Sequence, residues 1–117
     1  MTVKTNEAVH QNLENMDHLD FTAWNTTDWD LFRQLHSADV HVEVNGQNGT
    51  DGIDSHVEAM RSLIEQAGGQ PMQVQSHPIS FGSGEWTCVV GEFASGARMV
   101  TVAKWRDGAI AEEYIWL

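Results

Sequence analysis

Hydrophobic residues in the first quarter of the chain return every three or four positions. This spacing lines one face of a helix, and it is carried by Val9, Leu13, Met16, Ala23 and Trp24. The pattern predicts a first helix from about Asn6 to Trp24. Residues 25–28 have short polar side chains that cap helix ends, so residues 29–35 are expected to form a short second helix. The two helices would form a hairpin.

The hydrophobic period changes to two after Asp39, where Val40, Val42 and Val44 alternate with polar residues. Such alternation predicts a strand with one buried face. The turn-forming run 45–49 then separates this strand from the next helical pattern.

A third helix is predicted after this turn, because apolar residues again form a stripe at Ile53, Val57, Met60 and Ile64. Thr50 or Asp51 is expected to cap its N-terminus. Gly68 and Gly69 tolerate the left-handed conformation in which many helices end, and Pro71 cannot continue a helix. The third helix should therefore end before Gly68.

The last third of the chain contains four extended segments, separated by glycine-containing turns, at 72–81, 85–94, 98–106 and 109–117. The turn at Asp107 and Gly108 is the clearest, because a two-residue hairpin needs positive φ angles. The apolar phase flips across residues 76–78, which predicts a bulge. We expect an α+β fold of the cystatin-like barrel type, in which a curved, antiparallel or mixed sheet wraps over three N-terminal helices to form a cone.

Composition narrows the class of protein. The chain has 117 residues, which fits one compact domain, and a formal net charge of -11, which would repel nucleic acid. Cys88 is the only cysteine and is expected to fill a hydrophobic position, so no internal disulfide can form. We find neither an export signal nor an apolar run long enough to span a bilayer. These features predict a cytoplasmic protein with no nucleic-acid or membrane partner.

One carboxylate stands inside the first hydrophobic stripe. Helical spacing places Asp20 near the centre of the apolar face that Met16 and Trp24 share. Burying an unpaired ionised carboxylate is very costly. Asp20 therefore either pairs with a donor in the core, such as Arg33 or Arg98, or faces a cavity with a raised pKa. In the second case it would serve as an acid or base near neutral pH.

Two further residues can reach the same interior. Alternation in the last strand sends Glu112 and Glu113 to opposite faces, and we expect Glu113 to point inward with Ile115. There it would share a proton with Asp20, or it would be an ordinary solvated residue if it points outward. His56 flanks the apolar stripe of the third helix, from which it reaches a cavity or is satisfied by the backbone.

The six histidines do not show the spacing of a local metal motif. His36 and His41 lie five residues apart across a change from helix to strand, and His10 and His18 lie eight apart on the first helix. The sequence therefore predicts no metal site.

Three segments carry a resemblance to a known family. Residues 28–44 (DWDLFRQLHSADVHVEV), 49–60 (GTDGIDSHVEAM) and 104–116 (KWRDGAIAEEYIW) resemble the SnoaL-like polyketide cyclases, which belong to the nuclear transport factor 2-like superfamily. The likeness extends over nearly the whole chain from about Glu7 and implies a single SnoaL-like domain, 1–117. Members of the superfamily include isomerases, dehydratases, epoxide hydrolases, cyclases and non-enzymatic binders.

The ketosteroid isomerases of that superfamily give a position-by-position comparison. Their oxyanion-hole tyrosine falls on Asp20, their proton-abstracting aspartate falls on Val44, and their second oxyanion donor falls near Thr101. The acid that often follows the last strand in the cyclases would lie at or past Leu117. The resemblance thus implies an inward-facing Asp20 but a different base from that of the isomerases.

These observations predict a cofactor-independent enzyme that transfers protons on a small apolar or polycyclic carbonyl compound, by cyclisation, isomerisation or dehydration. Asp20 would be the general acid or base, Glu113 and His56 would assist it, and Thr101 would donate a hydrogen bond to the oxyanion. The expected pocket walls are Trp24, Val44, Met60, Trp86, Met99 and Trp105.

The alternative is a non-catalytic module that binds a small ligand or dimerises. The outer face of the sheet, which would carry Val100, Val102 and Tyr114, is expected to form a symmetric homodimer contact.

Overall fold

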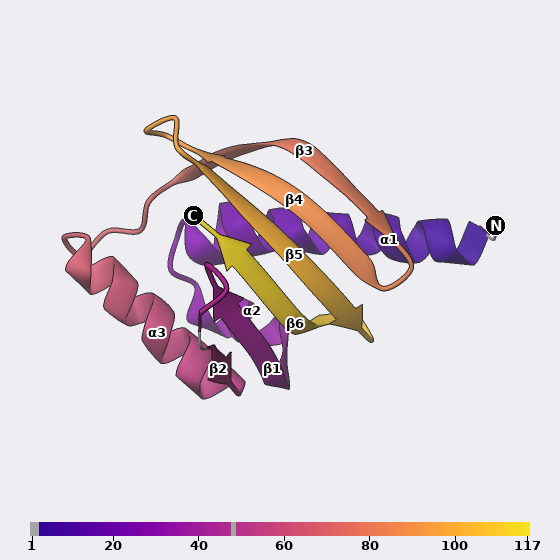
Figure 1. Ribbon diagram of the computed structural model, residues 1–117, viewed down its shortest axis with the longest axis horizontal. Helices are drawn as coiled ribbons and strands as arrows, with labels where there is room; N and C mark the ends of the chain where they lie inside the picture. Colours follow the sequence, from indigo (N-terminus) through magenta and orange to yellow (C-terminus); the bar gives the residue numbers. More distant parts are fainter. Residues whose placement is uncertain (1–2, 48) are drawn as a thin grey trace.

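The computed structural model describes residues 3–47 and 49–117 of the chain. Helix α1 (Val3–Asp17) continues directly into a π-helical segment, η1 (His18–Trp24), so the predicted first helix is confirmed although its last part is wound more loosely. This widened winding brings the backbone N–H of Asn25 to the carbonyl oxygen of Asp20, five residues earlier, at 3.2 Å. The segment that carries Asp20 is therefore π-helical, and it continues the line of α1 (Figure 1).

The second predicted helix is present as α2 (Trp29–Gln34). Its N-cap is Asp28, whose Oδ1 accepts a hydrogen bond from the backbone N–H of Leu31 at 3.1 Å. This bond satisfies one of the free donors at the start of the helix. It fixes the short helix that leads into the first strand.

The third predicted helix is present as α3 (Ile53–Gln66). Its end at the glycine pair is confirmed, since Gly68 and Gly69 both have positive φ angles. The expected side-chain cap from Thr50 or Asp51 is wrong, because these residues form a short strand, β2 (Thr50–Asp51), and Gly52 takes the N-cap position with φ of 92°. The turn returns the chain to pair with the preceding strand, which removes both side chains from the capping position.

One six-stranded sheet completes the fold, with strand order β2-β1-β6-β5-β4-β3. All neighbours are antiparallel except β1 and β6, which run parallel. The longer strands are β1 (His36–Val44), β3 (Val74–Ser83), β4 (Trp86–Phe93), β5 (Arg98–Arg106) and β6 (Ala109–Trp116). The predicted α+β architecture with a mixed sheet is confirmed, and the four C-terminal strands lie where their alternation placed them.

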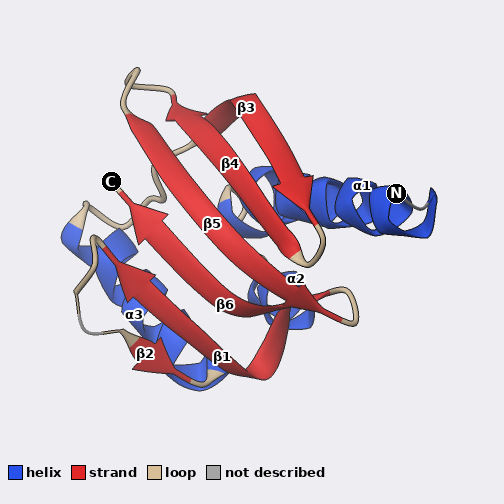
Figure 2. Ribbon diagram, turned by 45° about the vertical axis from the view of Figure 1, so that its right-hand side comes forward, coloured by secondary structure: helices blue, strands red, loops and turns tan. Residues whose placement is uncertain are grey.

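The helices lie on one face of the curved sheet (Figure 2). Helix α1 packs against β3 and β4, whereas α2 and α3 pack against β1. The register of β3 shifts between Ser76 and Ile79, which confirms the bulge predicted there. The core between helices and sheet is built mainly from Met16, Leu19, Ala23, Phe32, Val40, Val42, Val57, Val89, Ala103, Trp105 and Ile110. Within the described residues, no helix has both the length and the apolar composition needed to cross a membrane.

We predict that Asp28→Ala lowers the free energy of unfolding by about 1 kcal/mol, because the N-terminus of α2 loses its side-chain acceptor. Asp28→Asn keeps a side-chain oxygen and is the matched control, with a much smaller loss expected. Urea denaturation of both variants measures the difference. Equal losses in the two variants would show that the acceptor does not stabilise α2.

Candidate functional site

A cavity of about 160 Å³ lies between the helices and the concave face of the sheet. Apolar side chains from η1, α3, β4, β5 and β6 form most of its wall. The titratable or hydroxyl-bearing members of the lining are Asp20, His56, Thr101 and Glu113, which are the four residues predicted to carry the chemistry. The structure therefore brings together the four predicted residues, which lie far apart in the sequence.

The mouth of the cavity is formed by exposed lining residues near the end of α3 and near the end of β6. Leu63, Met72 and Leu117 are each more than two-fifths exposed although they also line the cavity. A ligand that enters here meets apolar surface first and the polar residues deeper inside.

Asp20 is buried and is held by a histidine rather than by an arginine. His77, at the bulge of β3, places its Nε2 2.7 Å from Oδ2 of Asp20 and its Nδ1 2.9 Å from Oδ1 of Asp17. The predicted alternative of a core ion pair with Arg33 or Arg98 is wrong. These arginines bind other carboxylates near the surface, those of Asp54 and Glu92 respectively.

Burial raises the pKa of Asp20 above its ordinary value of 3.8. The hydrogen bond from His77 opposes this rise only in part, and the negative charges of Glu113 and Asp17 add to it. Burial alone would lower the pKa of His77, but its contacts with Asp20 and Asp17 outweigh this effect and raise it above 6.5. The sequence-based expectation of a cavity-facing Asp20 with a raised pKa agrees with this geometry.

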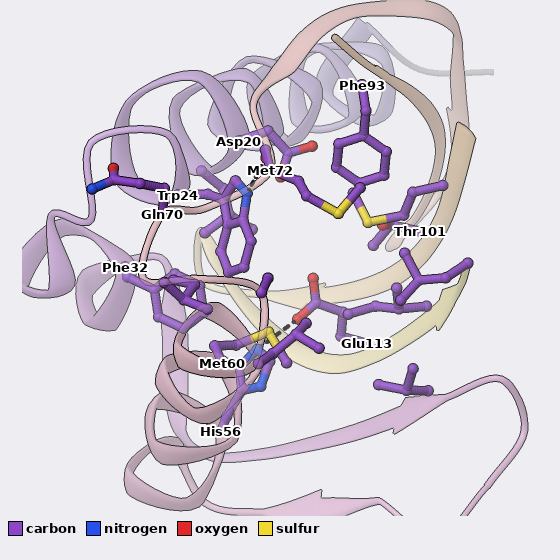
Figure 3. A pocket seen from close by; sticks show the side chains of 18 residues that line it. Asp20, Trp24, Phe32, His56, Met60, Gln70, Met72, Phe93, Thr101 and Glu113 are labelled. Atoms are coloured by element: carbon purple, nitrogen blue, oxygen red, sulfur yellow. Dashed lines mark hydrogen bonds and ion pairs between the residues drawn. The ribbon is translucent and has the colours of Figure 1, made fainter. Parts of the chain in front are cut away.

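Glu113 reaches the cavity from β6, on the side opposite Asp20 (Figure 3). Strand register pairs it with Ala103 on one side and Val42 on the other, both buried, so its side chain points inward as predicted. Two imidazoles contact the same carboxylate oxygen, Oε1, with Nε2 of His36 at 3.1 Å and Nε2 of His56 at 3.2 Å.

One backbone contact determines which ring nitrogen of His36 carries a hydrogen. Nδ1 of His36 lies 2.7 Å from the carbonyl oxygen of Phe32, and a carbonyl can only accept, so Nδ1 carries the hydrogen. Burial alone would raise the pKa of Glu113, but the two imidazoles lower it well below its ordinary value. Nδ1 of His56 is buried with no hydrogen-bond partner among the described residues.

Thr101 is buried and lines the cavity from β5. A threonine hydroxyl at this position can donate a hydrogen bond to a bound ligand.

Four of the six predicted wall residues line the cavity, namely Trp24, Val44, Met60 and Met99. Trp86 and Trp105 do not, so their assignment as walls is wrong. Trp86 starts β4 on the outer face, where it is exposed and stacks with Tyr114. Trp105 is buried in the core without lining the cavity, and its Nε1 donates to Oγ1 of Thr87 at 2.9 Å.

Sequence reasoning missed His77, and it set His36 aside as a metal ligand because of its spacing from His41. His36 precedes the alternating pattern of β1, and His77 stands in the bulge, so neither position belongs to a regular hydrophobic period. The signal for His77 was the broken alternation around it. His36 gives no local signal, because its partners come from α3 and β6.

The fold is shared with solved structures of NTF2-like and SnoaL-like proteins. A protein from Jannaschia sp. CCS1, named as a SnoaL-like polyketide cyclase, has a TM-score of 0.79 at 17% identity, over 92% of this chain and 85% of its own. Bal32a, from a soil-derived mobile gene cassette, has a TM-score of 0.77 at 13% identity, over 92% and 89%. A protein from Kribbella flavida, named as a ketosteroid isomerase, has a TM-score of 0.74 at 16% identity, over 97% and 81%.

No protein-family profile matches the sequence, and no curated protein matches it significantly. The structural likenesses therefore establish the fold that the sequence resemblance implied, and the activity has to be argued from the site itself.

We predict that the imidazole of His77 titrates above pH 6.5, and that Asp20→Asn lowers its pKa more than Asp17→Asn does, because the buried Asp20 makes the shorter contact. NMR titration of the ring resonances measures both shifts. The sign for stability follows: the contribution of His77 is fully present below pH 6.5 and is lost as the pH rises through its folded-state pKa. An unchanged His77 titration in Asp20→Asn would contradict the pairing.

Proposed function

We propose that the cavity binds a small, mainly apolar carbonyl compound and catalyses proton transfer on it, as in an isomerisation, cyclisation or dehydration. The observation that carries this proposal is the position of Asp20, a buried carboxyl group with a raised pKa on the wall of an apolar cavity. Because its pKa is raised, this carboxyl group takes up a proton more readily than an exposed one, which suits general acid or base catalysis.

The polar residues of the cavity would have different roles according to their positions. Asp20 exchanges a proton with the substrate, and its contact with His77 restores its starting protonation state. Across the cavity, Glu113 and His56 hold the polar end of the substrate, and the hydroxyl of Thr101 donates a hydrogen bond to the oxygen that becomes negative. In the described part of the chain no lysine or arginine lines the cavity, which favours an uncharged substrate over an anionic one.

The size of the cavity limits the substrate. A dry cavity of about 150 Å³ is enough for a benzene-sized molecule. The volume of about 160 Å³ therefore suits one ring better than the polycyclic ligands included in the expectation from the sequence, unless the mouth opens. Trp24 and Phe32 supply aromatic surface for such a ring.

We predict that the protein accelerates the exchange of protons next to the carbonyl group of single-ring ketones in D₂O. Asp20→Asn should reduce this exchange by about 10²-fold or more, since general acid–base groups contribute on that order. Loss of the proton signal by ¹H NMR measures the rate without knowledge of the natural reaction.

The matched control is Asp54→Asn, which makes the same chemical change at an exposed carboxylate outside the cavity. Equal exchange in the wild type and Asp20→Asn would contradict a catalytic role for Asp20. Ligand binding without any exchange would instead identify the alternative function, a non-catalytic binding module.

We also propose that a second copy of this chain covers the outer face of the sheet. Strand register places Phe81, Cys88, Val102 and Tyr114 in one row across β3, β4, β5 and β6. The buried positions of β4, β5 and β6 alternate with this row, so it lies on the face away from the core. The aromatic ring of Phe81 in this row is more than half exposed. A two-fold contact would remove this apolar surface from water. We also propose a cytoplasmic location, as expected from the sequence, where the thiol of Cys88 would stay reduced.

We predict that the wild-type protein elutes as a dimer and that Val102→Glu elutes as a monomer, because the substitution places a charge in the centre of the apolar row. Leu63→Glu introduces the same charge at an exposed aliphatic position off the sheet and should leave the dimer intact. Size-exclusion chromatography with light scattering measures both. A wild-type monomer would refute this contact.

A further inference from the structure

Four histidines in the described part of the chain either contact two carboxylates each or share one carboxylate. His41 binds Asp51 through Nδ1 and Glu43 through Nε2, both at 2.8 Å. His77 likewise binds one carboxylate at each ring nitrogen. Because the two nitrogens of an imidazole point in different directions, these carboxylates diverge and cannot share one ion.

The cluster around Glu113 has the opposite arrangement. His36 and His56 come from different elements and direct Nε2 at one carboxylate oxygen of Glu113. All three side chains are almost completely buried. Their ligand-type atoms lie within 4.8 Å of one another, and this is the one such group among the described residues. Three potential metal ligands therefore converge on a single point.

The hydrogen bond from His36 to the carbonyl oxygen of Phe32 determines what can lie between His36 and Glu113. Since Nδ1 of His36 carries the hydrogen, Nε2 of the neutral ring offers only a lone pair, and it faces a carboxylate oxygen at 3.1 Å. Two hydrogen-bond acceptors, Nε2 of His36 and Oε1 of Glu113, repel each other at this distance unless a cation lies between or beside them. That cation is a proton or a metal ion.

The distances from Glu113 to the two histidines suit a metal ion. Bonds of about 2.0–2.1 Å from a metal to nitrogen and oxygen ligands leave neighbouring ligand atoms roughly 3 Å apart, as observed between Glu113 and each histidine. A ligating histidine ordinarily donates its second N–H to a backbone carbonyl or carboxylate, as His36 does to Phe32. Nδ1 of His56 has no hydrogen bond among the described residues, so a small rotation of this ring toward an ion would break none there.

The position of the cluster also provides access. Glu113 and His56 line the cavity, whereas His36 lies behind them with a side chain that is not exposed at all. An ion held by these three groups would have protein on one side and the cavity on the other. This leaves coordination positions open toward a ligand, which is the arrangement of a catalytic rather than a structural site.

We propose that His36, His56 and Glu113 form a binding site for one divalent transition-metal ion, zinc or ferrous iron by ligand type, whose open positions face the cavity. The proposal departs from the cofactor-independent chemistry expected from the sequence. It extends the function proposed above and rests on it only for its catalytic meaning: a bound cation would polarise the carbonyl oxygen of the substrate while Asp20 exchanges the proton. Ion binding itself is testable without any substrate.

The test is a titration of protein freed of metal by a chelator, with Zn²⁺ followed by calorimetry and Co²⁺ followed by its visible absorption. We expect one ion per chain. Glu113→Gln and His56→Gln should each weaken binding by at least about 10-fold, since even the loss of a group that only orients a ligand has an effect of that order. His41→Gln removes a histidine from a diverging arrangement that does not line the cavity, and it should leave the affinity unchanged.

Circular dichroism of each variant shows whether it folds, and His56→Gln serves as the independent variant if Glu113→Gln does not. Absence of saturable binding by the folded wild type, equal affinity in His56→Gln, or loss of binding in His41→Gln would each overturn the proposal. The proton-exchange assay separates the two hypotheses. Exchange that persists in metal-free protein supports the proposed function alone, and ion binding without exchange supports the metal site alone.

Discussion

Two carboxyl groups inside one apolar cavity impose the constraint on which this site depends. Each needs a partner that compensates the loss of water, and the chain supplies imidazoles rather than guanidinium groups. A histidine changes its charge near neutral pH, whereas an arginine stays charged. Asp20 and Glu113 therefore sit in surroundings that respond to a proton, and the same cavity contains one carboxyl group with a raised pKa and one with a lowered pKa.

The sequence predicts those features that local periodicity controls. A period of 3.6 residues turned Asp20 toward the interior, and a period of two turned Glu113 to the same interior from the last strand. Both predictions hold because each residue lies within a long run of apolar neighbours, whose burial forces the orientation of the whole element. The bulge at His77 was visible for the same reason, since an interrupted alternation requires an irregular strand.

The remaining features depend on contacts between distant segments. His36 and His56 meet Glu113 only after β1 pairs in parallel with β6 and α3 packs on β1, and no short motif encodes that meeting. Trp86 was assigned to the wrong face of its strand. Trp105 was assigned to the correct, buried face, but it does not reach the cavity. Alternation specifies which side of a sheet a residue occupies once the phase is known, but it does not specify the distance to a cavity.

The π-helical winding of η1 gives the position of Asp20 an unusual dependence on chain length. A π-helical turn corresponds to an α-helix with an inserted residue, so a single deletion between His18 and Trp24 would restore ordinary winding. The side chains beyond the deletion would then rotate by about 100° relative to those before it. Insertions and deletions in this segment, and not only substitutions, are thus a route by which proteins of this architecture can gain or lose a buried acid without rebuilding the sheet.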